Sequence, residues 1–131
     1  MDYNFIWVGP TAGAPIVTIA TYGISFNSYV ISLMGNPAKV LIGFDEKNKI
    51  LGVKPVDDSN DHIAYDFAKK ERKGYVRISN KDFIKYISAI TGNNFKKAER
   101  YLANWDDKTK VLTVNLMQPM DSFVKKAEED A

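Results

Sequence analysis

The 131-residue sequence has no cysteine and a single histidine, His62. Without cysteine, disulfide bonds, zinc–thiolate sites and a cysteine nucleophile are all excluded. One histidine with no marked serine or aspartate partner does not indicate a catalytic triad. The glycine-containing segment 9–13 is not followed by the Gly-Lys-Ser/Thr of a phosphate-binding loop. We therefore expect no catalytic residues and no cofactor, and rank an enzyme or small-ligand binder last among the functions considered.

Long apolar runs and early basic residues are missing as well. No apolar run approaches the roughly 18 residues of a membrane-spanning helix. No lysine or arginine occurs before Lys39, so the apolar start lacks the charged region of a signal peptide. We expect a cytoplasmic protein that does not associate with membranes. Hydrophobic residues make up 45% of the chain, which at this length predicts a single domain over 1–131.

What the sequence does contain is a repeated segment, 44–53 and 105–114, at an offset of 61 residues. Five of the ten aligned positions are identical. In each copy an aromatic residue precedes a charged turn, and alternating apolar residues follow it, which predicts a β-hairpin. The acidic pairs Asp45-Glu46 and Asp106-Asp107 are then exposed turn residues rather than a general acid and base.

The likeness extends upstream at an offset of 54 residues, where Ile24-Ser25 aligns with Ile78-Ser79. Apolar residues follow each pair at helical spacing, so a helix is expected in both places, longer in the second. A further strand is expected over Ile16 to Thr21, and segment 63–70 reads as a short helix or extended linker. Candidate helix caps are Ser25 or Asn27 and Ser79 or Asn80, and the residues expected to end the helices are Gly35 and Gly92.

We interpret the two copies as strand-helix-hairpin units over about 22–56 and 74–118. A basic linker at 66–74 joins them, and a tail at 119–131 follows. The fold class is then α+β and β-rich, with both units forming one small barrel around a shared core. The alternative is chance recurrence of a charged hairpin, because Asp, Lys and Asn are common turn residues.

Charge is distributed unevenly along the chain. Segment 69–100 holds ten basic and three acidic residues, a net charge of +7, whereas the remainder carries −5. A basic centre between acidic flanks indicates a polyanionic partner, although a solvated linker and helix surface is the alternative. The residues suited to phosphate contacts are Lys69, Lys70, Arg72, Lys73, Arg77, Lys81 and Lys85.

The acidic residues before His62 admit two interpretations. Asp57, Asp58 and Asp61 supply oxygen ligands for a metal ion, but their spacing lacks the pattern of a calcium loop. A solvated polar loop fits the same residues, and we expect no metal site here.

The order of these elements resembles the AbrB-like swapped-hairpin superfamily, including its MraZ-like members with two units in one chain. The residues that carry the resemblance are Ile24-Ser25-Phe26, Leu33-Met34-Gly35, the strand from Val40 to Phe44, and Ile50-Leu51-Gly52-Val53-Lys54-Pro55. The resemblance implies a swapped-hairpin barrel and a transcription regulator that binds duplex DNA as an oligomer. Because segment 16–38 has no lysine or arginine, the cations for DNA lie in the second unit.

Two functional hypotheses follow. In the first, the protein is a non-catalytic regulator that binds duplex DNA through the surface from Lys69 to Lys85. In the second, it is a protein-interaction or accessory domain of the same fold that binds no nucleic acid. A homo-oligomer is compatible with either.

Overall fold

The structure is a computed structural model that describes residues 14–57 and 63–120. The loop around His62, the chain start before residue 14 and most of the tail at 119–131 lie outside the described residues. No helix within the two described ranges is long and apolar enough to cross a membrane.

The described residues form eight strands and two α-helices. All strand pairs are antiparallel and belong to one sheet with the order β5-β3-β4-β8-β7-β1-β2-β6. The predicted β-rich α+β class is confirmed. The elements are β1 (Ile16–Ala20), β2 (Gly23–Phe26), α1 (Ser28–Leu33), β3 (Lys39–Asp45), β4 (Ile50–Val56), β5 (Tyr65–Asp66), the 3₁₀ helix η1 (Ala68–Lys70), β6 (Val76–Ser79), α2 (Lys81–Thr91), β7 (Glu99–Asp106) and β8 (Val111–Asn115).

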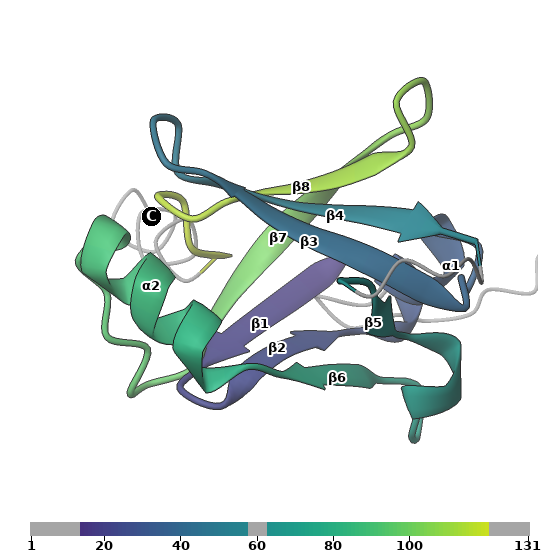
Figure 1. The fold of residues 1–131 in the computed structure, drawn as a ribbon, viewed down its shortest axis with the longest axis horizontal. Helices are drawn as coiled ribbons and strands as arrows, with labels where there is room; N and C mark the ends of the chain where they lie inside the picture. The colour runs from purple at the N-terminus through teal and green to yellow at the C-terminus, as the bar shows by residue number, and fades with distance from the viewer. Residues whose placement is uncertain (1–13, 58–62, 121–131) are drawn as a thin grey trace, which may run out of the picture.

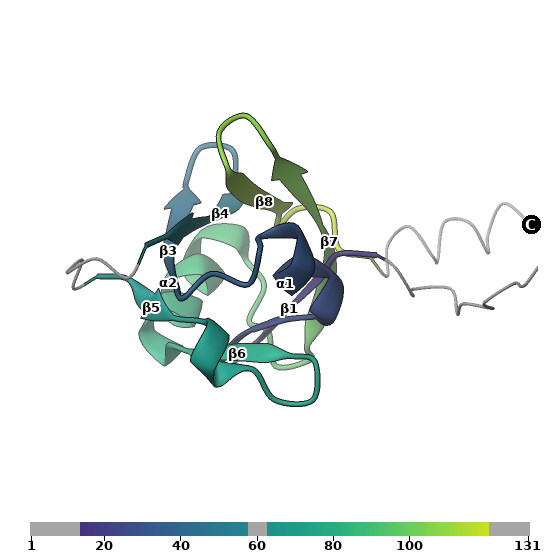
Figure 2. The same cartoon turned by 90° about the vertical axis from the view of Figure 1, so that its right-hand side faces the viewer.

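The sheet curls into a nearly closed barrel. Its end strands β5 and β6 meet without pairing, and the Asn80 side-chain amide donates to Tyr65 Oη across the seam at 2.7 Å. The two helices lie at opposite ends of the barrel, α2 on the left of Figure 1 and α1 on the right. Figure 2 looks along the barrel, with α1 in front and α2 behind.

Asparagine begins both helices. Asn27 Oδ1 accepts from Val30 N at 3.0 Å, and Asn80 Oδ1 accepts from Phe83 N at 3.0 Å, which selects the asparagines over the serines. Gly92 ends α2 in the left-handed conformation at φ 80°, as predicted. The second helix is the longer one, with 11 residues against six in α1.

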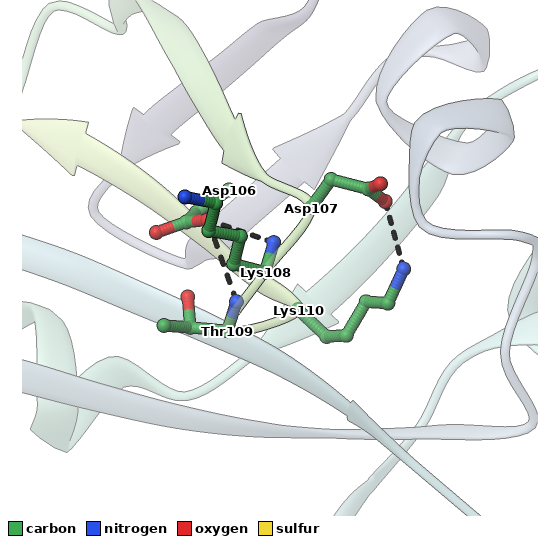
Figure 3. A network of polar contacts seen from close by, with 5 residues as sticks. All are labelled: Asp106, Asp107, Lys108, Thr109 and Lys110. Atoms are coloured by element: carbon green, nitrogen blue, oxygen red, sulfur yellow. Dashed lines mark hydrogen bonds and ion pairs between the residues drawn. The ribbon is translucent and has the colours of Figure 1, made fainter.

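The two predicted hairpins are present, β3–β4 and β7–β8, with tips of the same design. Asp106 Oδ1 accepts from the backbone N–H groups of Lys108 and Thr109 (Figure 3). In the other hairpin, Asp45 Oδ1 accepts from Asn48 N at 3.0 Å. Lys49 and Lys110 close the turns at φ 57° and 58°. These N–H donors lower the pKa of both exposed aspartates. The negative charge of each carboxylate therefore stabilises its turn.

The hairpins join each other through β4 and β8. Gly52 lies opposite Thr113, and these two residues are aligned with each other in the repeat. On either side the buried pairs Leu51–Val114 and Val53–Leu112 exchange roles, since Leu51 aligns with Leu112 and Val53 with Val114. The pairing is therefore symmetric about the Gly52–Thr113 pair.

A second symmetric pairing joins β2 to β6 on the other side of the barrel. Ile24 lies opposite Ile78, its aligned residue at the offset of 54, and both are buried. Both ladders are therefore centred on residues that are aligned with each other in the sequence.

A third correspondence involves β1 and β5, which the sequence did not reveal. Strand β1 pairs with β7, placing Val17 opposite Tyr101 and Thr18 opposite Arg100. Strand β5 pairs with β3 at the equivalent register, with Tyr65 opposite Val40 and Asp66 opposite Lys39. The segment expected as a short helix or extended linker therefore contributes both a strand and the 3₁₀ turn η1.

Both halves of the chain contribute side chains to the barrel interior. Fully buried examples are Val17, Phe26, Leu51, Phe67 and Tyr101. Phe44 and Trp105, the aromatic residues that precede the two charged turns, pack against this core while only partly buried. The Tyr101 hydroxyl is buried and has no hydrogen-bond partner within the described ranges. Burial raises the pKa of Tyr101 to about 12, the Glu99 carboxylate adds to the rise, and the nearby Asn93 side chain opposes it.

Gly23 marks the closest approach of two strands. A Cβ atom built there would lie 2.1 Å from the carbonyl oxygen of Ile78 on β6. We expect Gly23→Ala to lower the free energy of unfolding by about 3 kcal/mol, because the β2–β6 ladder must open to admit the methyl group. Urea denaturation measures this. The control is Gly43→Ala on β3, where no atom lies within 4 Å; equal losses in both variants would contradict the argument.

Removing the Tyr101 hydroxyl tests its unpartnered burial. Tyr101→Phe should leave the free energy of unfolding at pH 7 unchanged or raise it by up to about 1 kcal/mol, since no hydrogen bond is removed. The neutral phenol is favoured in the folded state, so the wild type should lose stability as pH rises from about 10 toward 12. The variant should lose less over this window in urea titrations. A loss of more than about 1 kcal/mol at pH 7 would indicate a hydrogen bond instead.

Candidate nucleic-acid interface

The seven basic residues predicted to contact phosphate are all exposed, but they spread over three places. Lys69 and Lys70 belong to η1, and Arg72 and Lys73 follow it. Arg77 lies on β6, and Lys81 and Lys85 lie on α2. In Figure 1 these elements run along the lower side of the barrel from right to left.

Two of the seven side chains bond to groups that are near them in the sequence. Lys69 Nζ lies 3.1 Å from the Asp66 carboxylate. The Arg72 guanidinium donates to the carbonyl oxygens of Lys69 and Glu71 at 3.1 and 2.7 Å. Lys69 therefore links η1 to β5, and Arg72 holds the turn after η1.

Lys81 and Lys85 border a different feature. They flank a groove of about 670 Å³ beside α2, whose floor includes Ile84 and Ala89. This groove is the most voluminous of the hollows described here, yet its lining is mostly apolar and brings no third cation to the two lysines. Size alone therefore does not identify it as an anion site.

Arg77 lies in line with a cation that was not among the seven, Arg100. Thr18 lies opposite Arg100 on one side and Ser25 on the other, and Ser25 lies opposite Arg77. The four residues form one row across β7, β1, β2 and β6, on the outer face of the sheet. With strands about 4.8 Å apart, the row spans about 14 Å and places two hydroxyls between two guanidinium groups. We call it the cationic row.

Arg77 is steadied in this row by an aromatic ring. Its guanidinium carbon lies 4.6 Å from the centre of the Tyr22 ring, a cation–π contact. Tyr22 is itself tied to the neighbouring strand, since its carbonyl oxygen accepts from Asn80 N at 3.1 Å.

Lys73 reaches the same face through a tight turn. Lys73 and Gly74 have φ values of 54° and 84°, and Arg72 and Tyr75 exchange backbone hydrogen bonds of 2.8 and 3.0 Å around them. Positive φ at both central residues is typical of a type I′ hairpin turn. The turn places Lys73 at its tip and Tyr75 beside the cationic row.

A cleft of about 430 Å³ lies between this turn and the start of α1, and we call it the α1 cleft. Asn27 holds its base: its side chain accepts from Ile16 N at 3.2 Å and donates to Ala14 O at 2.8 Å, besides capping α1. The side chains used below line the cleft: Thr18, Ser25, Tyr29, Lys73, Tyr75 and Arg100.

The matching registers of β1 with β7 and of β5 with β3 give this cleft a counterpart with different chemistry. A smaller hollow of about 290 Å³ is lined by Lys39, Asp66 and Lys69. Lys39 corresponds to Arg100 and Asp66 to Thr18. An acidic side chain therefore replaces a hydroxyl in the counterpart and pairs with Lys69. Of these two clefts, as lined by the described residues, the α1 cleft is the one that combines cations with hydroxyl groups, a set suited to anions.

Arg100 is the residue that sequence reasoning missed. It lies within the basic segment 69–100, but its distance along the chain from Arg77 gave no reason to place them together. Only the strand register across β7, β1, β2 and β6 aligns them. Among the described residues no group of three or more Asp, Glu or His side chains could hold a metal ion.

Comparison with known proteins adds no assignment, because no protein-family model, curated protein sequence or solved structure matches this chain.

The difference between the two clefts can be tested by removing the acid. Asp66→Thr should raise the salt concentration needed to elute the protein from heparin, because Lys39 and Lys69 would face a neutral hydroxyl, as Arg100 faces Thr18. The control is Asp57→Thr, which changes the net charge equally at an exposed position outside both clefts. Equal shifts in the two variants would show that net charge alone governs binding.

Proposed function

We propose that the chain is a tandem of two strand-helix-hairpin units that clasp each other in the manner of the swapped-hairpin superfamily. Three features support this: the symmetric pairing of β4 with β8, that of β2 with β6, and the matching registers of β1 with β7 and β5 with β3. Most of these ladders join one unit to the other. Each unit would therefore leave apolar strand faces unburied without its partner.

We further propose that the protein is a non-catalytic DNA-binding protein, consistent with the regulators that the sequence resembles. The observation that carries this proposal is the cationic row, flanked by Lys73. Guanidinium groups and hydroxyls on a rigid sheet are donors that nucleic-acid phosphates accept. Such contacts position DNA without reading its sequence, so this face supplies affinity rather than specificity.

The proposal narrows the predicted set of contacts. Lys73 and Arg77 keep their proposed role and Arg100 joins them. Lys69 instead pairs with Asp66, and Arg72 bonds to the turn after η1. Lys70, Lys81 and Lys85 remain candidates for peripheral phosphate contacts. We place the protein in the cytoplasm.

One observation favours the second function, a protein-interaction domain that binds no nucleic acid. The groove beside α2 has an apolar floor at Ile84 and Ala89 and a basic rim at Lys81 and Lys85. Such a groove suits an apolar segment with acidic flanks, from another protein or a second copy of this chain. If this is the function, substitutions at Lys73, Arg77 and Arg100 should not change the affinity for the protein partner.

Charge reversal on the cationic face tests DNA binding. In filter-binding titrations with duplex DNA, the wild-type affinity should fall steeply as salt increases. The triple variant Lys73→Glu, Arg77→Glu, Arg100→Glu should bind more weakly at low salt. The slope of log K against log salt should shrink by about 2 to 3, because each of these side chains would no longer neutralise a phosphate.

The matched control is Lys47→Glu, Lys54→Glu, Lys108→Glu, which imposes the same charge change on the exposed hairpins. Circular dichroism and urea denaturation confirm that both variants fold. DNA binding by the wild type with equal losses in the two variants would refute this face as the interface. No retention of duplex DNA by the wild type at either salt concentration would refute duplex binding.

A further inference from the structure

We propose that the α1 cleft binds one unstacked nucleotide of single-stranded DNA, with the base against Tyr75 and Tyr29 and the phosphate on Lys73 and Arg100. The inference rests on the proposed function and specifies the form of DNA that fits this face.

The first step concerns the two tyrosines. Tyr75 is 58% exposed and Tyr29 is 43% exposed, whereas most large apolar side chains in the described ranges are buried in the barrel. They come from distant parts of the chain, one after the Lys73-Gly74 turn and the other in the first turn of α1, yet both line the α1 cleft. Exposed aromatic rings in a basic groove are the features on which successive bases stack.

The second step concerns the groups around the rings. Lys73 and Arg100 supply positive charge within the cleft, and Thr18 and Ser25 supply hydroxyls that can donate to phosphate or sugar oxygens. The volume of about 430 Å³ falls within the range of sites that enclose a small molecule. One cleft therefore holds a stacking surface, cations and hydroxyls, which match the base, phosphate and sugar of a nucleotide.

The third step explains the preference for a single strand. In a duplex each base is stacked and paired inside the helix, so its face cannot reach a tyrosine in a cleft. An unpaired strand can turn its bases toward the protein, and every base offers a face for stacking. Duplex DNA would contact only the cations of this surface and not the tyrosine rings.

A neighbouring hollow extends the path of the strand. It has a volume of about 290 Å³ and is lined by Thr18, Ser25, Tyr75 and Arg77. Tyr75 borders both hollows, so a chain leaving the α1 cleft passes this ring and meets the next cation, Arg77. The sugar-phosphate backbone of the strand would then run along the cationic row, across the sheet from β7 to β6.

The counterpart cleft provides an internal contrast. Its lining of Lys39, Asp66 and Lys69 with two alanines includes no aromatic ring. Phe83, the residue aligned with Tyr29, is partly buried and packs against the core. Aromatic rings and hydroxyl side chains therefore occur together in the α1 cleft, and the described lining of the counterpart has neither.

Fluorescence anisotropy with labelled oligothymidylate and a labelled duplex of equal length tests the proposal on the full chain. We expect the wild type to bind the single strand more tightly. Tyr75→Ala and Tyr29→Ala should each weaken single-strand binding about 10-fold and leave duplex binding within about twofold. Tyr75→Phe, which keeps the ring, should retain affinity. Tyr86→Ala on α2 is the matched control, an exposed tyrosine outside the cleft, and should also retain affinity.

The outcomes separate this inference from the function beneath it. Duplex binding that equals or exceeds single-strand binding, or single-strand affinity unchanged in both tyrosine-to-alanine variants, overturns the inference and leaves DNA binding intact. A wild type that binds neither oligonucleotide overturns the function and the inference together. Because both tyrosines are exposed, urea denaturation should show that their alanine variants fold, and the Tyr75→Phe variant tests the ring without removing it.

Discussion

The pairing of β4 with β8 is the contact on which the rest of this structure depends. Two hairpins that are distant in sequence meet there and bury the cross-strand pairs Leu51–Val114 and Val53–Leu112. An isolated two-stranded hairpin is at best marginally stable in water, so neither hairpin would persist without the other. The β2–β6 pairing repeats this solution across the barrel, and both are centred on residues that the repeat aligns.

Near-symmetry makes the differences between the halves informative. Strand β1 pairs on both sides, with β7 and β2, whereas β5 pairs with β3 alone. The chain between β5 and β6 instead forms η1 and the turn that carries Lys73. The ladder that would close the barrel is replaced by one side-chain hydrogen bond, from Asn80 to Tyr65. The same turn that leaves the seam incomplete builds one wall of the α1 cleft.

The candidate site belongs to the sheet rather than to any one segment. Its cationic row draws one residue from each of four strands, and Asn27 ties the start of β1 to α1 beneath the cleft. Such a scaffold holds charged groups at fixed spacing without ordering them on binding, which lowers the entropic cost of association. The counterpart cleft shows how little changes the chemistry: an aspartate in place of a threonine gives Lys69 an ion-pair partner.

The sequence alone predicted the hairpins, the two helices and the exposed position of the acidic turn residues, whereas the structure chose Asn27 and Asn80 from the two cap candidates of each helix. These are local features, set by turn chemistry, capping and apolar spacing over a few residues. The sequence also predicted a basic surface that included Lys69 and Arg72. The structure shows both side chains bonded to neighbouring groups, which a count of charges does not reveal. The cationic row, the α1 cleft and the place of β5 were decided by tertiary structure. Strand register fixes which residues lie side by side, and register depends on burying apolar faces from segments far apart in the chain.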